Sequence, residues 1–478
     1  MTARTDLTQA MRLYAITDRA YDALRPLPDA VDQAIQGGAT CIQLRDKHIT
    51  PTTESDARFV AQRCKYAGIP FIVNDDVELA CRVDADGVHV GQDDASCIQA
   101  RALLGDDKIV GVSVHSVEQA RIAEAQGADY LGVGALFSTD TKPDAIIVSP
   151  EELTRIVNAV SIPVVAIGGL NLQTLDILEG TGVDGAAVVS AVFGADDVSS
   201  ATCRLRRKVE QVLGRRPSVV TIAGSDSSGG AGIQADLKTM EAQSVFGQSA
   251  IAALTAQNTL GVSGVLTVAP DFVVAQLEAI FADIVPDAVK IGMLSDPAVV
   301  HAVATVLATC QARNIVLDPV MVATSGAELS TSASVQALID ALFPLACVVT
   351  PNLSEARVLS GCEIETKQDM EQAARAIIAR GAHAVLIKGG HLGDCADDVL
   401  ITESGESFWF EGALIATNDT HGTGCSLSSA IASYLAKGYS LPFSVEQAKA
   451  YVAGALRHDI HLGRGSGPLN HSWRWDYT

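Results

Sequence analysis

The residues best placed to do chemistry lie in a glycine-rich segment near the C-terminus. His421, Gly422, Thr423, Gly424 and Cys425 read HGTGC, directly before a run of small residues typical of a helix. Glycines at a helix start let consecutive backbone N–H groups converge on one anion, and the helix dipole adds to the attraction. We expect a cysteine there to have a lowered pKa and to act as base or acid. The structural alternative is a small buried cysteine in a tight turn.

Oxygen ligands and a cation follow the apolar runs that precede this segment. Asp318, Asn352 and Glu355 offer oxygens to Mg²⁺ or to its waters, and Lys388 offers a positive charge to a nucleotide phosphate. Because the chain contains no G-x-x-x-x-G-K-[ST] motif, it lacks a P-loop. Together with the anion hole, these residues predict phosphoryl transfer of another class, with catalytic Gly422, Gly424 and Cys425 and ATP contacts from Lys388, Asn352, Thr423 and Gly424.

The first half of the chain carries a different set of polar residues, placed just after eight short apolar runs. The runs alternate with helical patterns and each looks buried on both faces. This predicts a closed parallel (β/α)8 barrel, with a doubly wound open sheet as the alternative. The runs are Leu13–Thr17, Cys41–Arg45, Phe71–Asn74, Gly87–Val90, Ile109–Val114, Tyr130–Gly134, Val164–Ile167 and Ala186–Val189.

In such a barrel the polar residues share one rim, and their types indicate two bound anions. The cations Arg45, Lys47 and Lys142 suit a polyphosphate. Asp75 and Asp94 follow neighbouring strands and suit a hard cation such as Mg²⁺. The segment Gly168–Gly169 and Ser190 follow the last two strands, where barrels hold a phosphate. No residue is an obvious nucleophile. The set therefore favours departure of a metal-bound diphosphate, stabilised by electrostatics.

Length, composition and charge narrow the class of protein. A chain of 478 residues is long enough for two domains, with 48% hydrophobic residues and no apolar run of membrane-spanning length. The start of the chain has no signal-peptide pattern, and the 10 cysteines include no C-x-x-C pair, so we expect a cytoplasmic protein with reduced thiols. The net charge of -22 argues against nucleic acid as a partner.

The division between the halves is marked by Arg215, Arg216 and Pro217, which are typical of a linker. We expect domains at 1–213 and 218–478, joined by 214–217. The second domain begins with a strand and the turn GSDSSGGAGIQAD. That turn matches a loose dinucleotide fingerprint, but no acidic residue stands at the required distance. The later apolar runs predict an open α/β/α sheet.

The first half resembles thiamine-phosphate synthase over about residues 10–213. The motifs that carry the resemblance are QLRDK (43–47), IVNDDVELA (72–80), GVHVGQDDA (87–95), GVSVHS (111–116), FSTDTK (137–142) and VVAIGGL (164–170). The resemblance implies that hydroxymethylpyrimidine diphosphate is joined to a thiazole phosphate, with loss of pyrophosphate through a pyrimidinyl-methyl cation. It implies Mg²⁺ at Asp75 and Asp94. The implied substrate residues are Gln43, Arg45, Lys47, Asn74, Ser113, Thr139, Thr141, Lys142, Gly169, Val189 and Ser190, with Lys142 also catalytic.

The second half, about residues 217–470, resembles hydroxymethylpyrimidine/phosphomethylpyrimidine kinase of the ribokinase-like superfamily. The motifs are GSDSSGGAGIQAD, LTAQNT, KIGML, DPVMVATSG, TPNLSEA, LIKGGH and THGTGC. The resemblance implies two ATP-dependent phosphorylations, and it places Cys425 where many ribokinase relatives carry an aspartate base. The implied pyrimidine-pocket residues are Gly224, Ala231, Asp236, Gln257, Met293 and Val320.

The product of the second half would be the substrate of the first, which favours one bifunctional enzyme of thiamine biosynthesis. Three alternatives stay open: a pyridoxal or sugar kinase in the second half, a thiazole tautomerase in the first, and a binding protein whose sites are inactive. Gln257 and Met293 argue against a pyridoxal or sugar kinase. We expect small-molecule substrates, ATP, Mg²⁺, no membrane partner and a homo-oligomer.

Overall fold

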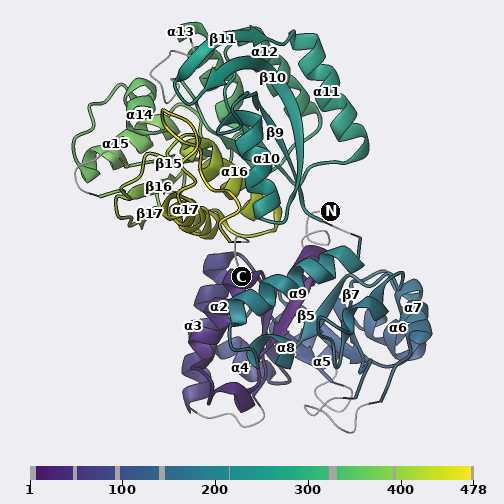
Figure 1. Cartoon of the computed structure of the whole chain (residues 1–478). Helices are drawn as coiled ribbons and strands as arrows, with labels where there is room; N and C mark the ends of the chain where they lie inside the picture. The colour runs from purple at the N-terminus through teal and green to yellow at the C-terminus, as the bar shows by residue number, and fades with distance from the viewer. Residues whose placement is uncertain are drawn as a thin grey trace. The chain divides into compact units, whose positions relative to one another are not determined.

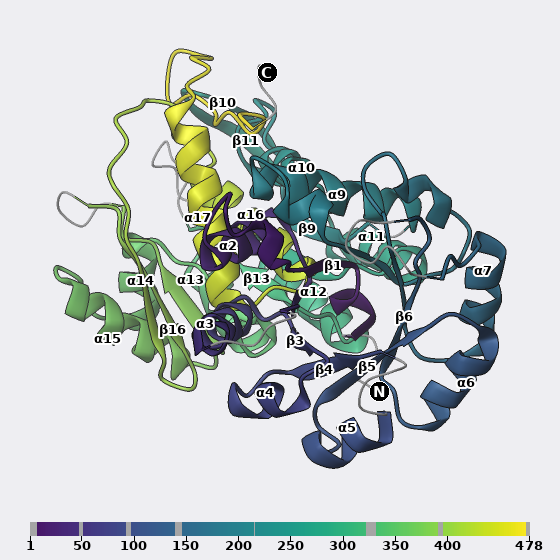
Figure 2. The same ribbon diagram turned by 90° about the horizontal axis from the view of Figure 1, so that it is seen from below.

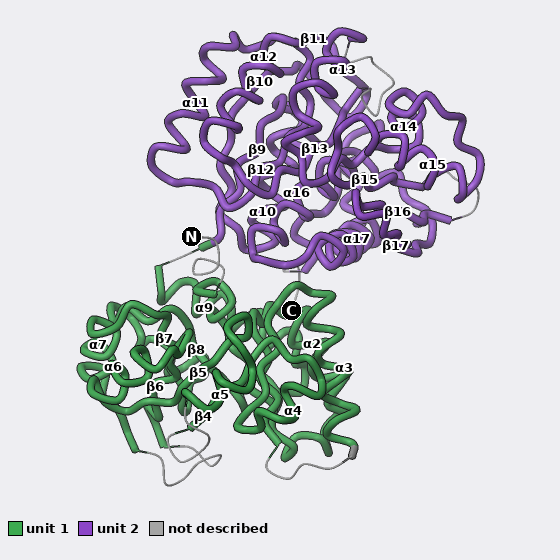
Figure 3. Tube along the Cα trace, turned by 180° about the vertical axis from the view of Figure 1, so that it is seen from behind, with its two compact units in different colours: residues 1–216 green, residues 217–478 purple. Residues whose placement is uncertain are grey.

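The structure is a computed structural model, and it describes residues 7–46, 51–91, 97–138, 146–214, 216–321, 331–390 and 395–474. It forms two compact units, residues 1–216 and 217–478, drawn in separate colours in Figure 3. We expect two domains, 1–213 and 218–478, that each fold independently, and this stays a prediction. Within the described ranges, no helix combines the length and the apolar character needed to span a membrane.

Eight parallel strands close into a barrel in the first unit, which confirms the predicted fold. The first strand pairs with both the second and the eighth, so the sheet has no free edge. The strands are β1 (Leu13–Ile16), β2 (Cys41–Leu44), β3 (Phe71–Asn74), β4 (Gly87–Val90), β5 (Ile109–Val114), β6 (Tyr130–Val133), β7 (Val164–Ile167) and β8 (Gly185–Val188).

Helices surround the barrel between successive strands, as Figure 2 shows for α4 to α7. Several of their N-termini are capped by short polar side chains; Asp76 caps α4 and Ser116 caps α6. The helical elements are η1 (Arg19–Tyr21), α2 (Leu27–Gly37), α3 (Pro51–Ala67), α4 (Val77–Arg82), α5 (Cys97–Leu104), α6 (Val117–Ala125), α7 (Pro150–Ala159), η2 (Leu175–Leu178), α8 (Ser190–Phe193) and α9 (Val198–Val212).

The second unit is a nine-stranded sheet in the order β11-β10-β9-β12-β13-β14-β15-β16-β17. Five neighbouring pairs from β10 to β15 are parallel, and the two edges end in antiparallel hairpins. The strands are β9 (Ser218–Gly224), β10 (Phe246–Asn258), β11 (Gly261–Thr267), β12 (Ala288–Ile291), β13 (Ile315–Leu317), β14 (Val348–Val349), β15 (Ala384–Ile387), β16 (Asp398–Thr402) and β17 (Ser407–Phe410).

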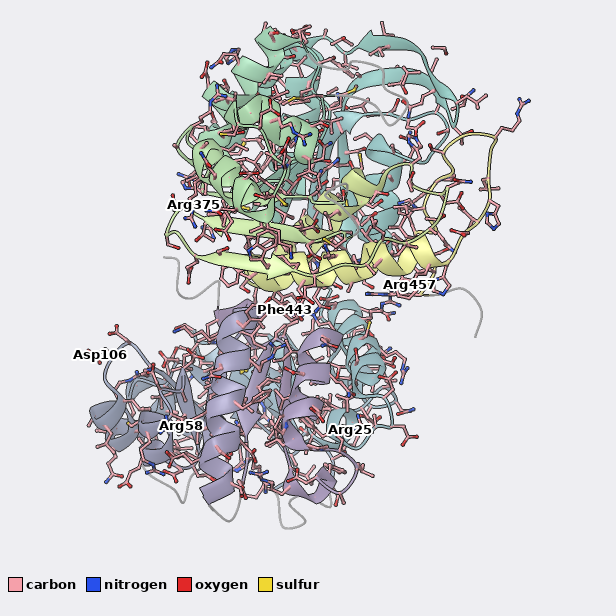
Figure 4. The ribbon with its side chains drawn as sticks, turned by 90° about the vertical axis from the view of Figure 1, so that its left-hand side faces the viewer. Arg25, Arg58, Asp106, Arg375, Phe443 and Arg457 are labelled. Atoms are coloured by element: carbon pink, nitrogen blue, oxygen red, sulfur yellow. The ribbon has the colours of Figure 1, made fainter. Side chains whose placement is uncertain are left out.

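Helices cover both faces of this sheet, which confirms the predicted three-layer α/β/α architecture (Figure 1). Alternate residues of one strand face opposite layers: in β9, Val220 packs with α11 to α15, and Val219 packs with α10, α16 and α17. Charged side chains lie on the outer surfaces of both units, such as Arg58 and Asp106 in the first unit and Arg375 in the second (Figure 4). The helical elements are α10 (Gly232–Ala242), α11 (Pro270–Asp283), α12 (Pro297–Thr309), α13 (Ser332–Ala337), η3 (Leu338–Leu342), η4 (Phe343–Leu345), α14 (Leu353–Ser360), α15 (Lys367–Ile378), α16 (Thr423–Ala436) and α17 (Leu441–Arg457).

Candidate functional sites

The predicted rim residues of the barrel lie at the carboxyl ends of their strands. Because all eight strands run parallel in a closed barrel, these ends share one face. Gln43 is in β2, Asn74 ends β3 and Ser113 is in β5, while Val189 and Ser190 follow β8. Five predicted residues fall outside the described ranges: Lys47, Asp94, Thr139, Thr141 and Lys142.

A chain of hydrogen bonds crosses the barrel interior and joins two of the predicted residues. Gln43 Nε2 donates to Tyr14 Oη (2.9 Å), which lies 2.8 Å from Tyr130 Oη. His89 lies 2.9 Å from Tyr130 Oη through Nδ1 and 2.9 Å from Ser113 Oγ through Nε2. Burial, reinforced at Tyr14 by the neighbouring Tyr130, raises the pKa of both phenols well above the usual value. Both phenols therefore stay protonated and hold Gln43 and Ser113 in fixed orientations.

Sequence reasoning missed Tyr14, His89 and Tyr130, although a signal was present. A tyrosine or histidine inside an otherwise apolar barrel strand has to find a polar partner in the interior. A glycine in a neighbouring strand makes the room: a Cβ on Gly111 would lie 2.1 Å from the Tyr130 ring.

The charged residues at the rim are held by local contacts. Arg45 donates from its guanidinium to Asp18 Oδ2 (3.2 Å) and from its backbone to Thr17 Oγ1 (3.1 Å). Asn74 Nδ2 donates to Asp75 Oδ2 (2.5 Å), and Asp75 adopts a left-handed φ of 63°. That strained conformation points to a functional requirement at Asp75. Asp18 is a further rim carboxylate that sequence reasoning missed.

The turn after β7 has the backbone shape expected of a phosphate cradle. Gly168 and Gly169 have φ of 102° and 69°, and a Cβ on Gly169 would lie 2.6 Å from Phe137 Cβ. Thr174 Oγ1 donates to the Gly169 carbonyl (3.0 Å) and fixes the turn. Ser190 is exposed at the start of α8, after the adjacent strand β8. The turn and Ser190 thus stand next to each other on the rim.

In the second unit, the N-terminus of α16 meets the predicted acid and cation. Gly422 has a φ of 86°, and a Cβ there would lie 1.9 Å from the Gly230 carbonyl oxygen. A Cβ on Gly424 would lie 3.4 Å from Lys388 Nζ and 3.5 Å from Asp318 Oδ2. Gly422 is therefore required by close approach, a Cβ on Gly424 would make ordinary contacts, and the predicted anion hole stands beside Asp318 and Lys388.

Asp318 is the centre of this cluster. Lys388 Nζ and Thr350 Oγ1 donate to its Oδ1 at 2.8 and 3.2 Å, and Ser428 Oγ lies 3.4 Å from its Oδ2. Burial raises the pKa of Asp318, but the charges of Lys388 and Lys290 lower the pKa by more. The pKa therefore lies below its ordinary value, and the carboxylate stays ionised. The pKa of Lys388 is raised because the Asp318 and Glu355 charges outweigh the opposing effect of burial.

Asn352 and Glu355 serve first as the capping box of α14. Each side chain accepts the backbone N–H of the other, at 2.8 and 2.9 Å. Burial, with the Asp318 charge, raises the pKa of Glu355 despite the opposing Lys388 charge. Asn352 pairs with Lys388 across neighbouring strand ends, so the capping box also borders the cluster. The predicted ligand role of these oxygens stays a prediction.

The expected lowering of the Cys425 pKa is wrong. Desolvation raises the pKa of the thiol to about 11, because it outweighs the opposing charge of Lys290 and Asp236 adds to the rise. The helix N-terminus and a nearby lysine do not overcome this effect. Cys425 is therefore a neutral thiol near pH 7 and cannot supply a thiolate base at an appreciable concentration.

Four of the six predicted pyrimidine-pocket residues lie in or against the glycine-rich turn: Gly224, Ala231, Gln257 and Met293. A Cβ on Gly224 would lie 2.6 Å from Met293 Cε, and Ser227 Oγ of the turn donates to Gln257 O (2.7 Å). Ala231 is the N-cap of α10, and Gln257 reaches the α16 start through His421. Val320 N donates to Asp318 O (2.8 Å), and Asp236 is fully buried, so the substrate contacts of these two residues stay predictions.

Asp236 belongs to a buried ion pair that sequence reasoning missed. Lys290 Nζ and Thr221 Oγ1 donate to its Oδ2 at 2.8 and 2.6 Å, and Ser429 Oγ donates to its Oδ1 (2.7 Å). Lys290 is also fully buried. Burial lowers its pKa, but the charges of Asp236 and Asp318 and the hydrogen bond to Asp236 together raise the pKa by more. A lysine inside the strand β12 was the available signal, since such a residue has to be paired.

Comparison with known proteins places each unit in a family. Residues 13–192 match the family described as thiamine monophosphate synthase, and residues 226–470 match the family described as phosphomethylpyrimidine kinase. The thiamine biosynthesis bifunctional protein ThiED of Geobacter sulfurreducens is 43% identical over 96% of this chain and 93% of its own. The chain belongs to the ThiED family. It is therefore a bifunctional enzyme with a synthase unit and a kinase unit, as predicted.

Two further relatives match the kinase unit of this ThiED-family chain. The hydroxymethylpyrimidine/phosphomethylpyrimidine kinase of Streptomyces coelicolor is 46% identical over 54% of this chain and 95% of its own. Bacillus subtilis pyridoxal kinase, solved as an ADP complex, is 38% identical over 54% of this chain and 99% of its own, with a TM-score of 0.50. The fold is thus shared with pyridoxal kinases, while the family match favours the pyrimidine kinase over the pyridoxal alternative.

Proposed function

We propose that the kinase unit phosphorylates 4-amino-5-hydroxymethyl-2-methylpyrimidine with ATP, first to the monophosphate and then to the diphosphate. The synthase unit then joins the diphosphate to 4-methyl-5-(2-phosphoethyl)thiazole, giving thiamine phosphate and pyrophosphate. The observation that carries the kinase assignment is the α16 N-terminus beside the Asp318–Lys388 pair. Gly422 there is required by close approach to the Gly230 carbonyl, and Lys388 Nζ donates to Asp318 at 2.8 Å.

In the kinase unit, the substrate hydroxyl attacks the γ-phosphorus of ATP in line with the departing ADP oxygen, and the hydroxyl proton passes to an oxygen of the transferred phosphoryl group. The backbone N–H groups of Gly422, Gly424 and Cys425 stabilise the charge of the transferring phosphoryl group, whereas Thr423 N donates to Thr420 O (3.3 Å). Lys388 lies beside Gly424 and adds a positive charge on the same side. Gly224, Ala231, Gln257 and Met293 hold the pyrimidine, and the neutral thiol of Cys425 lies at the helix start.

In the synthase unit, the diphosphate leaves before the new bond to the thiazole nitrogen forms. Arg45 and the predicted lysines neutralise the departing charge. The interior chain from Gln43 to Ser113 orients the pyrimidine through fixed donors and acceptors. The turn at Gly169 and the adjacent Ser190 hold the thiazole phosphate, which places the ring nitrogen for capture of the cation.

Mg²⁺ fits the donor set of both units. Asp318 stays ionised and is buried against cations, and Asp75 is held in a strained turn next to Asn74. Carboxylate pairs of this kind bind Mg²⁺ together with substrate phosphates rather than in an all-protein cage. Within the described residues, no group of three or more His, Cys, Asp or Glu side chains lies together as a candidate metal site. When bound, Mg²⁺ would neutralise phosphate charge.

One experiment tests both halves of the proposal. The purified chain is incubated with hydroxymethylpyrimidine, ATP, thiazole phosphate and Mg²⁺, and each intermediate is followed by chromatography. We expect the monophosphate, the diphosphate and thiamine phosphate to appear in that order, and chelation by EDTA to stop both stages. Turnover of pyridoxal without turnover of the pyrimidine would overturn the kinase assignment.

Substitution of Cys425 tests its protonation state. A thiol with a pKa of about 11 is ionised in about one molecule in a thousand at pH 8, so a thiolate base is not available. We expect Cys425→Ser to keep kcat within about threefold of wild type, and wild-type kcat to change less than about threefold between pH 7 and 9. Initial rates across this range check both statements. A tenfold rise in kcat per pH unit that Cys425→Ser removes would restore the base assignment.

Substitution of Arg45 tests the diphosphate site of the barrel. Removing one charge-assisted contact by Arg45→Gln is expected to raise KM for the pyrimidine diphosphate about tenfold, with KM for the thiazole phosphate unchanged. Steady-state kinetics with each substrate varied in turn give both constants. Arg58→Gln is the control, since Arg58 is exposed on α3 and forms an ion pair with Glu54 on the same helix. Equal changes in both KM values would contradict the assignment.

The compartment and the assembly state are further proposals. All ten cysteines lie in the described ranges and none forms a disulfide, which supports the reducing cytoplasm. The β10–β11 hairpin exposes Leu254, Leu260 and Leu266, and the neighbouring α11 exposes Phe272, which supports self-association of the kinase unit. Sedimentation of the purified chain measures the assembly state, and a monomer at micromolar concentration would contradict this proposal.

A further inference from the structure

Three distant segments of the kinase unit meet at one buried imidazole. His421 Nε2 lies 2.8 Å from Asp226 Oδ2, in the glycine-rich turn after β9, and 3.1 Å from Gln257 Nε2, at the end of β10. The side chains of His421 and Asp226 are 8% and 3% exposed, whereas Gln257 is half-buried. The pair therefore links the start of α16 to a residue of the pyrimidine pocket.

The surroundings of Asp226 decide where the imidazole carries its proton. Its Oδ1 accepts from Ser228 N and Ser228 Oγ, both at 2.8 Å, and its Oδ2 accepts from Ala231 N (2.8 Å) and Gly230 N (3.2 Å). A carboxylate with four other donors around it is held in the ionised form, which only accepts hydrogen bonds. His421 Nε2 at 2.8 Å must therefore carry a hydrogen and donate it to Asp226.

A ring nitrogen that donates to Asp226 cannot also accept from Gln257. An amide nitrogen facing the Nε2–H would set two donors against each other at 3.1 Å. The two ends of a carboxamide have nearly the same shape, so a half turn places the Gln257 oxygen toward His421 at no steric cost. The amide hydrogens of Gln257 then face the pocket.

We propose that Asp226 and His421 are positioning residues that fix the carboxamide of Gln257, so that its NH2 group donates to a ring nitrogen of the pyrimidine substrate. This inference rests on the proposed pyrimidine kinase function. A half-buried glutamine with no such restraint presents its oxygen or its nitrogen at little difference in energy. The fixed orientation therefore selects substrates with a ring acceptor at that position, and a C–H there is rejected.

The imidazole has no room to turn away from this role. A Cβ on Gly230 would lie 2.5 Å from His421 Cδ2, so the ring packs directly on the backbone of the turn. His421 N donates to Gly467 O (2.9 Å), and Gly467 N donates to Asn418 O (3.0 Å). The segment 465–468 thus holds the backbone of His421 in place. This contact gives a structural role to part of the sequence GRGSGPLNH (residues 463–471).

The test uses the full-length chain and the variant His421→Met, which removes the donor and keeps much of the volume. We expect KM for the pyrimidine to rise about tenfold, while kcat and KM for ATP stay within about twofold. Substrate analogues with either ring nitrogen replaced by C–H give the second readout. Wild type should reject one analogue by about tenfold relative to the parent, and His421→Met should lose this discrimination.

Two further variants separate positioning from packing. His421→Gln restores an N–H donor near the same place and should recover the lower KM and the discrimination. His471→Leu is the matched control, because it removes another buried histidine that is hydrogen-bonded to α16 through Ser426 (2.9 Å). It should lower the melting temperature without changing the discrimination.

Each result decides the question. Unchanged discrimination in a folded His421→Met, or parallel losses for the pyrimidine and ATP, would overturn the proposal. If His421→Met does not fold, ¹⁵N-histidine NMR of the wild type replaces it, and an unprotonated Nε2 on His421 overturns the proposal while a protonated Nε2 supports it. Absence of any wild-type turnover of the pyrimidine would instead reject the kinase function itself.

Discussion

Lys290→Met is expected to lower the free energy of unfolding of the kinase unit by about 3–5 kcal/mol, because it leaves a buried charge without its partner. Lys290 and Asp236 are both fully buried, and Lys290 Nζ lies 2.8 Å from Asp236 Oδ2. Thr221 and Ser429 also donate to Asp236, but neither carries a charge. The orphaned carboxylate would then take up a proton or admit water, and either change loosens the packing of α10 on α16.

Chemical denaturation followed by tryptophan fluorescence and by kinase activity measures this loss. All three tryptophans of the chain lie in residues 217–478, so the fluorescence reports on this unit. Trp473 Nε1 donates to the carbonyl of Tyr451 in α17. The double variant Lys290→Met/Asp236→Leu removes both charges and is expected to recover most of the stability. Synthase activity serves as the internal control. A single variant as stable as wild type would show that the pair contributes little net stability.

The barrel was predictable from sequence because each strand carries its signal locally. Runs such as Phe71–Asn74 and Val164–Ile167 are almost wholly apolar, since both faces of a barrel strand are buried, and the structure has these strands with the predicted bounds. Polar residues at or just after the ends of several runs, such as Asn74, mark the rim. The sheet can close because the first of the eight parallel strands pairs with the last, which leaves no free edge.

The kinase sheet was predicted less completely, and the misses have a common physical cause. The exposed strand β11 shows no buried run, because its side chains lie at an edge, so pattern reasoning passed over its hairpin with β10. The pKa of Cys425 was wrong in direction because the helix start is visible in sequence, whereas the desolvation of the thiol depends on packing. The pairings of Lys290 and His421 join residues 54 and 195 positions apart, which no local pattern encodes.

Lys388→Gln is expected to lower kcat of the kinase by about a thousandfold, the largest effect on activity that we predict. Lys388 Nζ lies 2.8 Å from Asp318 and within reach of Gly424, so its charge stands where the phosphoryl group develops negative charge. Glutamine keeps a hydrogen-bond donor of shorter reach and loses the charge. ATP binding should weaken less than kcat, since the lysine acts mainly on the transition state.

The same substitution has a second consequence that separates catalysis from structure. Asp318 loses its nearest cation, so its pKa should rise from the lowered value toward the ordinary range, and the site should weaken as pH falls. Lys367→Gln is the matched control, because Lys367 pairs with Asp397 and is 54% exposed in the same unit. It should leave kcat unchanged. Equal losses in both lysine variants would mean that net charge, rather than the position of Lys388 at the helix start, governs phosphoryl transfer.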